Sequence, residues 1–157
     1  MSFFSSFKVS KKLYAQETNK NLNSKNYQLM IGQSVPTNEY GTFNLVYYNT
    51  QENRIIADTN APDKVINGLL LGNRYKITDK LSTNLLYLYN HTKEKSDDAT
   101  FEVERDDLLN TLSVGVDYKL NKTLSVTSNI KQIDNESNIN IYSYDKRTFD
   151  IFFKKIF

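Results

Sequence analysis

The sequence predicts an all-β protein, an antiparallel, up-and-down β-barrel that spans a membrane. Apolar and polar residues alternate with a period of two along most of the chain, most clearly from Asp107 to Leu120. This period belongs to a strand with one apolar and one polar face. Short connections alternate with long, polar ones, which is the pattern of outer-membrane barrels. The last alternating segment ends on an aromatic residue, Phe157.

The composition fits this class and excludes several others. The chain has 157 residues and is expected to form one domain over residues 1–157. Mean hydropathy is −0.57, and no stretch approaches the roughly 20 apolar residues that a spanning helix needs. A net charge of +2 offers no basic surface for nucleic acid. The absence of cysteine excludes thiolate metal sites, thiol catalysis and disulfides.

The first four strands are expected at residues 2–15, 26–35, 41–49 and 64–77. Tyr, Phe, Val, Thr and Ile are frequent in these segments, as in strands generally, and no helical stripe of apolar residues runs through them. The third segment is the least regular, because Val46 and Tyr48 interrupt its polar face. The residues of the apolar face are Phe3, Phe7, Val9 and Leu13 in the first segment, Tyr27, Leu29 and Ile31 in the second, and Leu69, Leu71 and Tyr75 in the fourth.

The last four strands are expected at residues 81–91, 107–120, 123–132 and 147–157. In the fifth segment Leu86 and Leu88 blur the alternation. The short connections are 36–40, 78–80 and 121–122, and the long ones are 16–25, 50–63, 92–106 and 133–146. The apolar positions are Leu85, Tyr87 and Tyr89, then Leu112, Val114, Val116, Tyr118 and Leu120, and finally Leu124, Val126 and Ile130.

This arrangement predicts an integral protein of the bacterial outer membrane with its turns and both ends on the periplasmic side. Such a protein is exported, yet the segment from Met1 to Phe4 lacks the basic and apolar regions of a signal peptide. We therefore expect that Met1 was placed before a mature domain or a fragment.

The polar face predicts a wet lumen. An interior of eight strands is just wide enough to be filled by side chains, and buried charges there need partners or water. Positive charge predominates on this face, which favours a larger barrel of which this chain is a part over a complete small one. The same charges serve either anion selectivity or a structural network. The lumen-facing charges are expected to be Lys8, Arg74, Lys76, Asp117, Lys119 and Lys131.

No catalytic, cofactor or metal site is predicted, and the protein is not expected to be an enzyme. The only histidine, His91, falls at a strand end and is interpreted as a rim residue, although a Ser–His–Asp site on a barrel wall stays open. An acidic loop lacks the ligand spacing and the glycine of a calcium loop, so we interpret it as a solvated extracellular loop. Its acids are Glu94, Asp97, Asp98, Glu102, Glu104, Asp106 and Asp107.

The last strand resembles the β-signal that the barrel-assembly machinery reads. Asp150 takes the polar position, Phe153 is one of the alternating hydrophobic residues and Phe157 is the terminal aromatic. Phe152 stands where glycine is usual, and Lys155 where a hydrophobic residue is usual. This resemblance implies insertion into the outer membrane, with the lipid bilayer and the assembly machinery as partners.

The wider tail, residues 137–147 followed by a strand to Phe157, resembles the ending of the surface lipoprotein assembly modifiers. The resemblance implies the C-terminal part of a barrel that exports lipoproteins, its cargo, to the cell surface. The chain shows no tetratricopeptide pattern, so that family's repeat domain would lie elsewhere. Two alternatives remain: a complete eight-stranded barrel like OmpA or OmpW with a structural, adhesive or small-solute role, and a soluble, lipocalin-like ligand-binding barrel.

Overall fold

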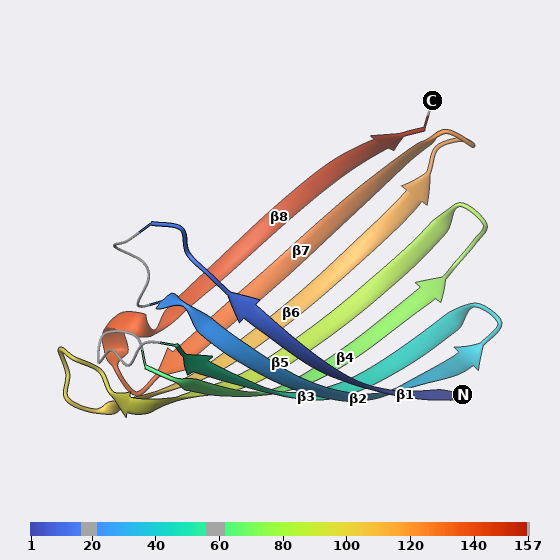
Figure 1. The fold of residues 1–157 in the computed structure, drawn as a ribbon. Coiled ribbons are helices and arrows are strands. Elements are labelled where there is room, and N and C mark those ends of the chain that lie inside the picture. Colours follow the sequence, from blue (N-terminus) through green and yellow to red (C-terminus); the bar gives the residue numbers. More distant parts are fainter. Residues whose placement is uncertain (17–21, 56–61, 157) are drawn as a thin grey trace.

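The computed structural model describes residues 1–16, 22–55 and 62–156, and these form one sheet of eight strands in sequence order (Figure 1). Every neighbouring pair is antiparallel, so the prediction of eight antiparallel, up-and-down strands is confirmed. A short 3-10 helix, η2 (Asn140–Tyr142), precedes the last strand. The strands are β1 (Ser2–Lys12), β2 (Ser24–Asn38), β3 (Gly41–Arg54), β4 (Lys64–Lys76), β5 (Leu81–Asp97), β6 (Glu104–Lys119), β7 (Leu124–Ser137) and β8 (Tyr144–Lys155).

Most strands run further toward the long loops than the alternation predicted. β5 continues to Asp97 and β7 to Ser137, each beyond the residue where the period-two pattern stops. Both faces are polar there, so the pattern disappears while the backbone ladder continues. At the other end, Pro36 lies inside β2 rather than in a turn, beside a register irregularity between Pro36 and Asn38. Proline has no N–H to donate to a ladder, so within sheets it is tolerated at irregular places such as this one.

The first strand is shorter than predicted. It ends at Lys12 instead of continuing to residue 15. Just beyond it, the Tyr14 backbone N–H donates to the side-chain oxygen of Asn23 at 2.7 Å. The backbone here therefore bonds to a side chain and leaves the ladder.

The register places the alternating apolar residues of neighbouring strands on the same face. One row crosses four strands, pairing Leu85 with Val114, Val114 with Ile130 and Ile130 with Phe149. The sheet is strongly curved (Figure 1). The alternate residues line the pocket on the hollow side, so these four lie on the outer, convex face. Each of the four is 46–63% exposed. The alternate positions form the concave face.

Burial in this sheet is inverted relative to a water-soluble protein. On β6 the buried residues are Gly115 and the polar Asp107, Thr111 and Ser113, and all four lie on the concave face. Among the described residues, only Ile139 is a buried hydrophobic side chain, at 5% exposure. The sheet therefore has no apolar core and presents its apolar face outward. None of the helical turns in the described ranges is long and apolar enough to span a membrane.

The sheet is open in this structure. β1 pairs only with β2, and β8 pairs only with β7. The outer edges of β1 and β8 thus carry backbone groups without a ladder partner among the described strands. The up-and-down topology is present, but closure into a barrel is not.

Two glycines of the concave face sit beneath aromatic rings of the neighbouring strand. The Tyr48 ring covers Gly68 and the Phe4 ring covers Gly32, so closely that a Cβ at either glycine would overlap the ring. The Tyr48 hydroxyl continues across Gly68 and donates to the side-chain oxygen of Asn90 on β5. Gly68 therefore lets one tyrosine tie together three strands.

Candidate functional site

The concave face holds the side chains from which a site can be built. All six charges predicted to face a lumen lie on it, because each falls on the polar phase of its strand and the register keeps the phases aligned. The six charged residues are Lys8 on β1, Arg74 and Lys76 on β4, Asp117 and Lys119 on β6, and Lys131 on β7.

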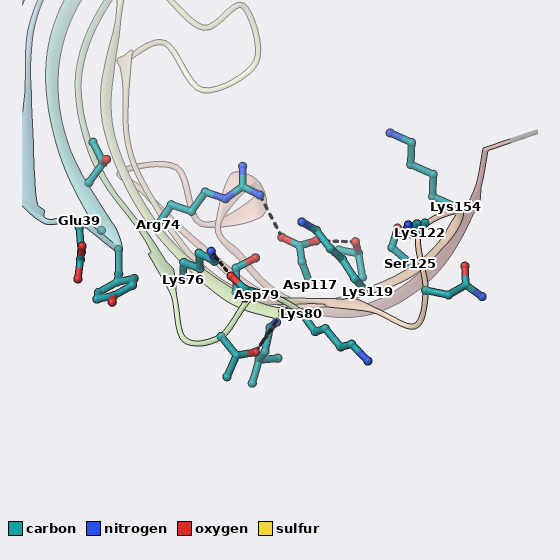
Figure 2. Close-up of a pocket in the computed structure, with 18 of the residues that line it drawn as sticks. Glu39, Arg74, Lys76, Asp79, Lys80, Asp117, Lys119, Lys122, Ser125 and Lys154 are labelled. Atoms are coloured by element: carbon teal, nitrogen blue, oxygen red, sulfur yellow. Dashed lines mark hydrogen bonds and ion pairs between the residues drawn. The ribbon is translucent and has the colours of Figure 1, made fainter.

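At the end of the sheet where the short turns lie, the concave face forms a cavity of about 880 Å³ (Figure 2). Arg74, Lys76, Asp117 and Lys119 line it, whereas Lys8 and Lys131 lie elsewhere on the face. We call this the turn-end cavity. Its cationic lining consists of Arg74, Lys76, Lys80, Lys119, Lys122 and Lys154, and its acidic lining of Glu39, Asp79 and Asp117.

Only part of this positive charge is neutralised. Lys76 pairs with Asp79, and its hydrogen bond and charge hold the pKa of the Asp79 carboxyl below its usual value. Arg74 approaches Asp117 at a long 3.9 Å and stays 72% exposed. Asp117 also accepts a hydrogen bond from the Thr127 hydroxyl at 2.6 Å. The four remaining lysines of the cavity have no ion-pair partner within the described ranges.

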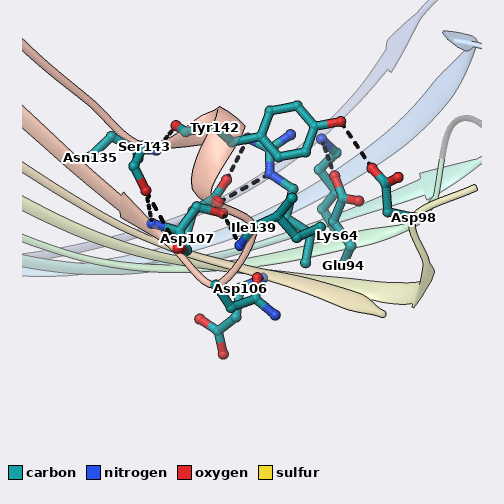
Figure 3. A network of polar contacts seen from close by, with 12 residues as sticks. Lys64, Glu94, Asp98, Asp106, Asp107, Asn135, Ile139, Tyr142 and Ser143 are labelled. Atoms are coloured by element: carbon teal, nitrogen blue, oxygen red, sulfur yellow. Dashed lines mark hydrogen bonds and ion pairs between the residues drawn. The ribbon is translucent and has the colours of Figure 1, made fainter. Parts of the chain in front are cut away.

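At the opposite end, the connection from β7 to β8 folds against the sheet (Figure 3). Ile139 is buried there, and the Asn135 amide donates to the Tyr142 carbonyl at 2.8 Å. The Arg105 guanidinium lies 3.8 Å from the centre of the Tyr142 ring. A hydrogen bond from the Tyr142 hydroxyl to Asp98, at 3.0 Å, raises the pKa of that hydroxyl. We call Asp98, Arg105, Asn135, Ile139 and Tyr142 the loop-end cluster.

Three cations of the concave face at the loop end have close carboxylate partners. Lys64 contacts Glu94 at 2.8 Å, and Glu94 is only 6% exposed. Arg105 contacts both oxygens of Asp107, at 2.6 and 3.0 Å. Arg54 contacts Glu52 at 2.7 Å. Close carboxylate partners thus hold three cations of the concave face at the loop end, whereas at the turn end only Lys76 has such a partner among the described residues.

The residues weighed for catalysis and metal binding are dispersed. His91 lies on the convex side at the loop end, where its Nε2 is 2.6 Å from Asp106, which Lys93 also contacts at 3.2 Å. Asp98 accepts the backbone N–H groups of Thr100 and Phe101 in a turn. Glu94, Asp98, Asp106 and Asp107 of the predicted loop therefore bind different partners. No group of three candidate ligands gathers within the described ranges.

The residues of the expected insertion signal fall on different faces. Asp150 pairs with Asn129 on the concave face, and Phe153 pairs with Val126 on the convex face. Phe152, which replaces the usual glycine, lies on the concave face and is 60% exposed. Phe157 lies outside the described residues.

Sequence reasoning missed Lys80, Lys122 and Lys154 as members of the turn-end cavity. Lys80 and Lys122 lie in the short turns between strands, and Lys154 lies near the end of β8. Antiparallel topology brings all short turns to one end of the sheet, so basic residues in those turns were a usable signal.

Comparison with known proteins assigns no family. No family model matches the chain, and no curated protein matches it.

Proposed function

We propose that this chain forms part of the wall of an outer-membrane β-barrel that serves transport or export. The inverted burial carries the proposal. Leu112 and Val114 are 45% and 47% exposed on the convex face, while the adjacent Thr111 and Ser113 are each 8% exposed on the concave face. A monomeric protein in water rarely leaves so large an apolar surface uncovered, and lipid covers it at no cost.

Strand length and the edge of the apolar face support a membrane location. The strands have 11–17 residues, and roughly 9–11 tilted residues are enough to cross the hydrocarbon layer. Toward the loop end, the Tyr47 and Tyr87 hydroxyls donate to the side chains of Asn67 and Asn110, at 3.1 and 2.7 Å. Tyrosines with a polar tip at the border of an apolar band are typical of the membrane interface.

The open edges favour a larger barrel. In the hydrocarbon layer of a bilayer, each unpaired backbone N–H or C=O costs several kcal/mol, so a spanning sheet is a closed ring there. In a small detergent micelle, by contrast, water can reach the two open edges. In the proposed location, further strands pair with β1 and β8. The charged concave face then borders a water-filled passage. The resemblance of the tail to the surface lipoprotein assembly modifiers is the support for lipoproteins as cargo.

The proposal predicts how the chain migrates in a semi-native gel. We expect the 157 residues, refolded in detergent micelles, to show β-structure by circular dichroism but no compact band that disappears on heating. Such a heat-sensitive band is the mark of a closed barrel. A sheet with two open edges has no closed ring to preserve in the gel.

Two results would contradict parts of this account. A heat-sensitive compact band would show that the chain closes by itself, as a small complete barrel of the OmpA or OmpW kind does. A folded monomer in buffer without detergent would refute the membrane location and favour a soluble barrel. A water-soluble protein run on the same gel controls for the effect of detergent on mobility.

A further inference from the structure

We propose that the turn-end cavity is a binding site for phosphate-bearing anions. The inference goes beyond the wall function proposed above, because it depends on the charges of the cavity and not on what surrounds the convex face. It rests on the contrast between the two ends of the concave face.

Convergence of separate elements gives the cavity its charge. Lys80 comes from the turn between β4 and β5, Lys122 from the turn between β6 and β7, and Lys154 from β8. Lys119 belongs to β6. Figure 2 shows Lys119, Lys122 and Lys154 along the same stretch of the curved wall. These lysines line one hollow, so an anion within it is attracted by several positive charges at once.

Nearby acids supply that anion only in part, since the charge of Lys119 also contributes to the lowered pKa of the Asp79 carboxyl. Asp79 is held by Lys76, and Asp117 is shared between Arg74 and the Thr127 hydroxyl. Glu39 lies in the turn between β2 and β3, at the other side of the cavity from Lys154 on β8. The loop end shows that this sheet can neutralise its cations when they are structural, because Lys64 and Arg105 there have close carboxylate partners.

The lining suits phosphate in particular. Lysine binds phosphate as a compact point charge, and hydroxyl groups donate to its remaining oxygens. Ser82 and Ser125 line the cavity beside the lysines, and Ser125 pairs in register with both Lys119 and Lys154. A volume of about 880 Å³ admits an anion with several phosphate groups. A concave surface with an excess of positive charge also raises the local concentration of such an anion.

Titration with tripolyphosphate tests the site. The probe is added to the protein in micelles of a nonionic detergent, and heat release is recorded by calorimetry. We expect saturable binding that weakens with added salt. The triple variant Lys119→Gln, Lys122→Gln, Lys154→Gln should bind about tenfold more weakly or worse, the loss expected when charge-assisted hydrogen bonds are removed.

A charge-matched control distinguishes a site from general attraction. Lys11, Lys25 and Lys95 are exposed and lie outside the cavity, so their replacement by glutamine changes the net charge equally and should leave the affinity within about twofold. No binding by the folded protein, or equal weakening in both triple variants, would overturn the site. Circular dichroism checks that each variant is folded. The gel experiment tests the proposed barrel wall and this titration tests the anion site, so the failure of one proposal can be distinguished from the failure of the other.

The source of the phosphate is decided by competition. Small vesicles of phosphatidylglycerol, compared with vesicles of phosphatidylcholine, are added to the protein loaded with tripolyphosphate. Displacement by the anionic vesicles alone would assign the site to lipid headgroups. Retention of the probe would assign it to a soluble phosphate compound.

Discussion

Replacing Ile31 by arginine is expected to destabilise the folded protein in micelles by about 2–4 kcal/mol, the cost of a basic residue on the lipid face of a membrane barrel. Ile31 lies on the convex face of β2 and is 52% exposed. The neighbouring substitution, Met30→Arg, should cost less than about 1 kcal/mol, because Met30 lies on the concave face, where a long charged side chain reaches water.

Ile31→Arg and Met30→Arg together distinguish a membrane protein from a soluble one, because the two locations predict opposite orders for their losses of unfolding free energy. In a water-soluble sheet the more exposed residue tolerates arginine better, so Ile31→Arg would be the milder change. Urea unfolding in micelles, followed by circular dichroism, gives the free energy of unfolding of both variants. A smaller loss for Ile31→Arg than for Met30→Arg would refute a lipid-facing convex surface.

Gly68→Ala should destabilise the sheet by about 1–3 kcal/mol, the range for overpacking a filled site. The added methyl group displaces the Tyr48 ring, and the hydrogen bond from the Tyr48 hydroxyl to Asn90 is lost with it. Gly72→Ala is the matched control, on the same strand and the same face. The nearest atoms to a Cβ at Gly72 are 3.8–3.9 Å away, an ordinary contact.

Gly72→Ala is therefore expected to be neutral or slightly stabilising, since glycine is less favourable than alanine within a strand. The same urea unfolding experiment measures both variants. Equal losses at Gly68 and Gly72 would show that the ring over Gly68 is not what requires the glycine.

The faces of the sheet could be predicted from the sequence wherever apolar and polar residues alternate strictly. Leu112 and Ser113 were assigned to opposite faces by alternation alone, and the register confirms it. Val46, Leu86 and Leu88 blurred the alternation because the concave face carries apolar side chains of its own. Val46 pairs with Leu70, and Leu70 pairs with Leu88, in a row that crosses three strands.

The loop-end cluster could not be predicted from local pattern. Arg105 lies over Tyr142, and Tyr142 reaches Asp98, although these residues are far apart in the sequence. Their contact depends on how one connection folds back over the sheet. The alternation of apolar and polar residues could not predict whether the sheet closes either. It assigns side chains to the two faces of a strand, but it does not indicate which strand pairs with an edge strand.

Fluorescence quenching of a single introduced tryptophan tests the central claim, that the convex face contacts lipid and the concave face does not. The chain contains no tryptophan, so each variant has one fluorophore. Phe152 and Phe153 are adjacent on β8, are 60% and 73% exposed, and lie on opposite faces. In micelles of a brominated detergent, we predict strong quenching of Phe153→Trp and weak quenching of Phe152→Trp. Equal quenching, or stronger quenching at residue 152, would contradict the account.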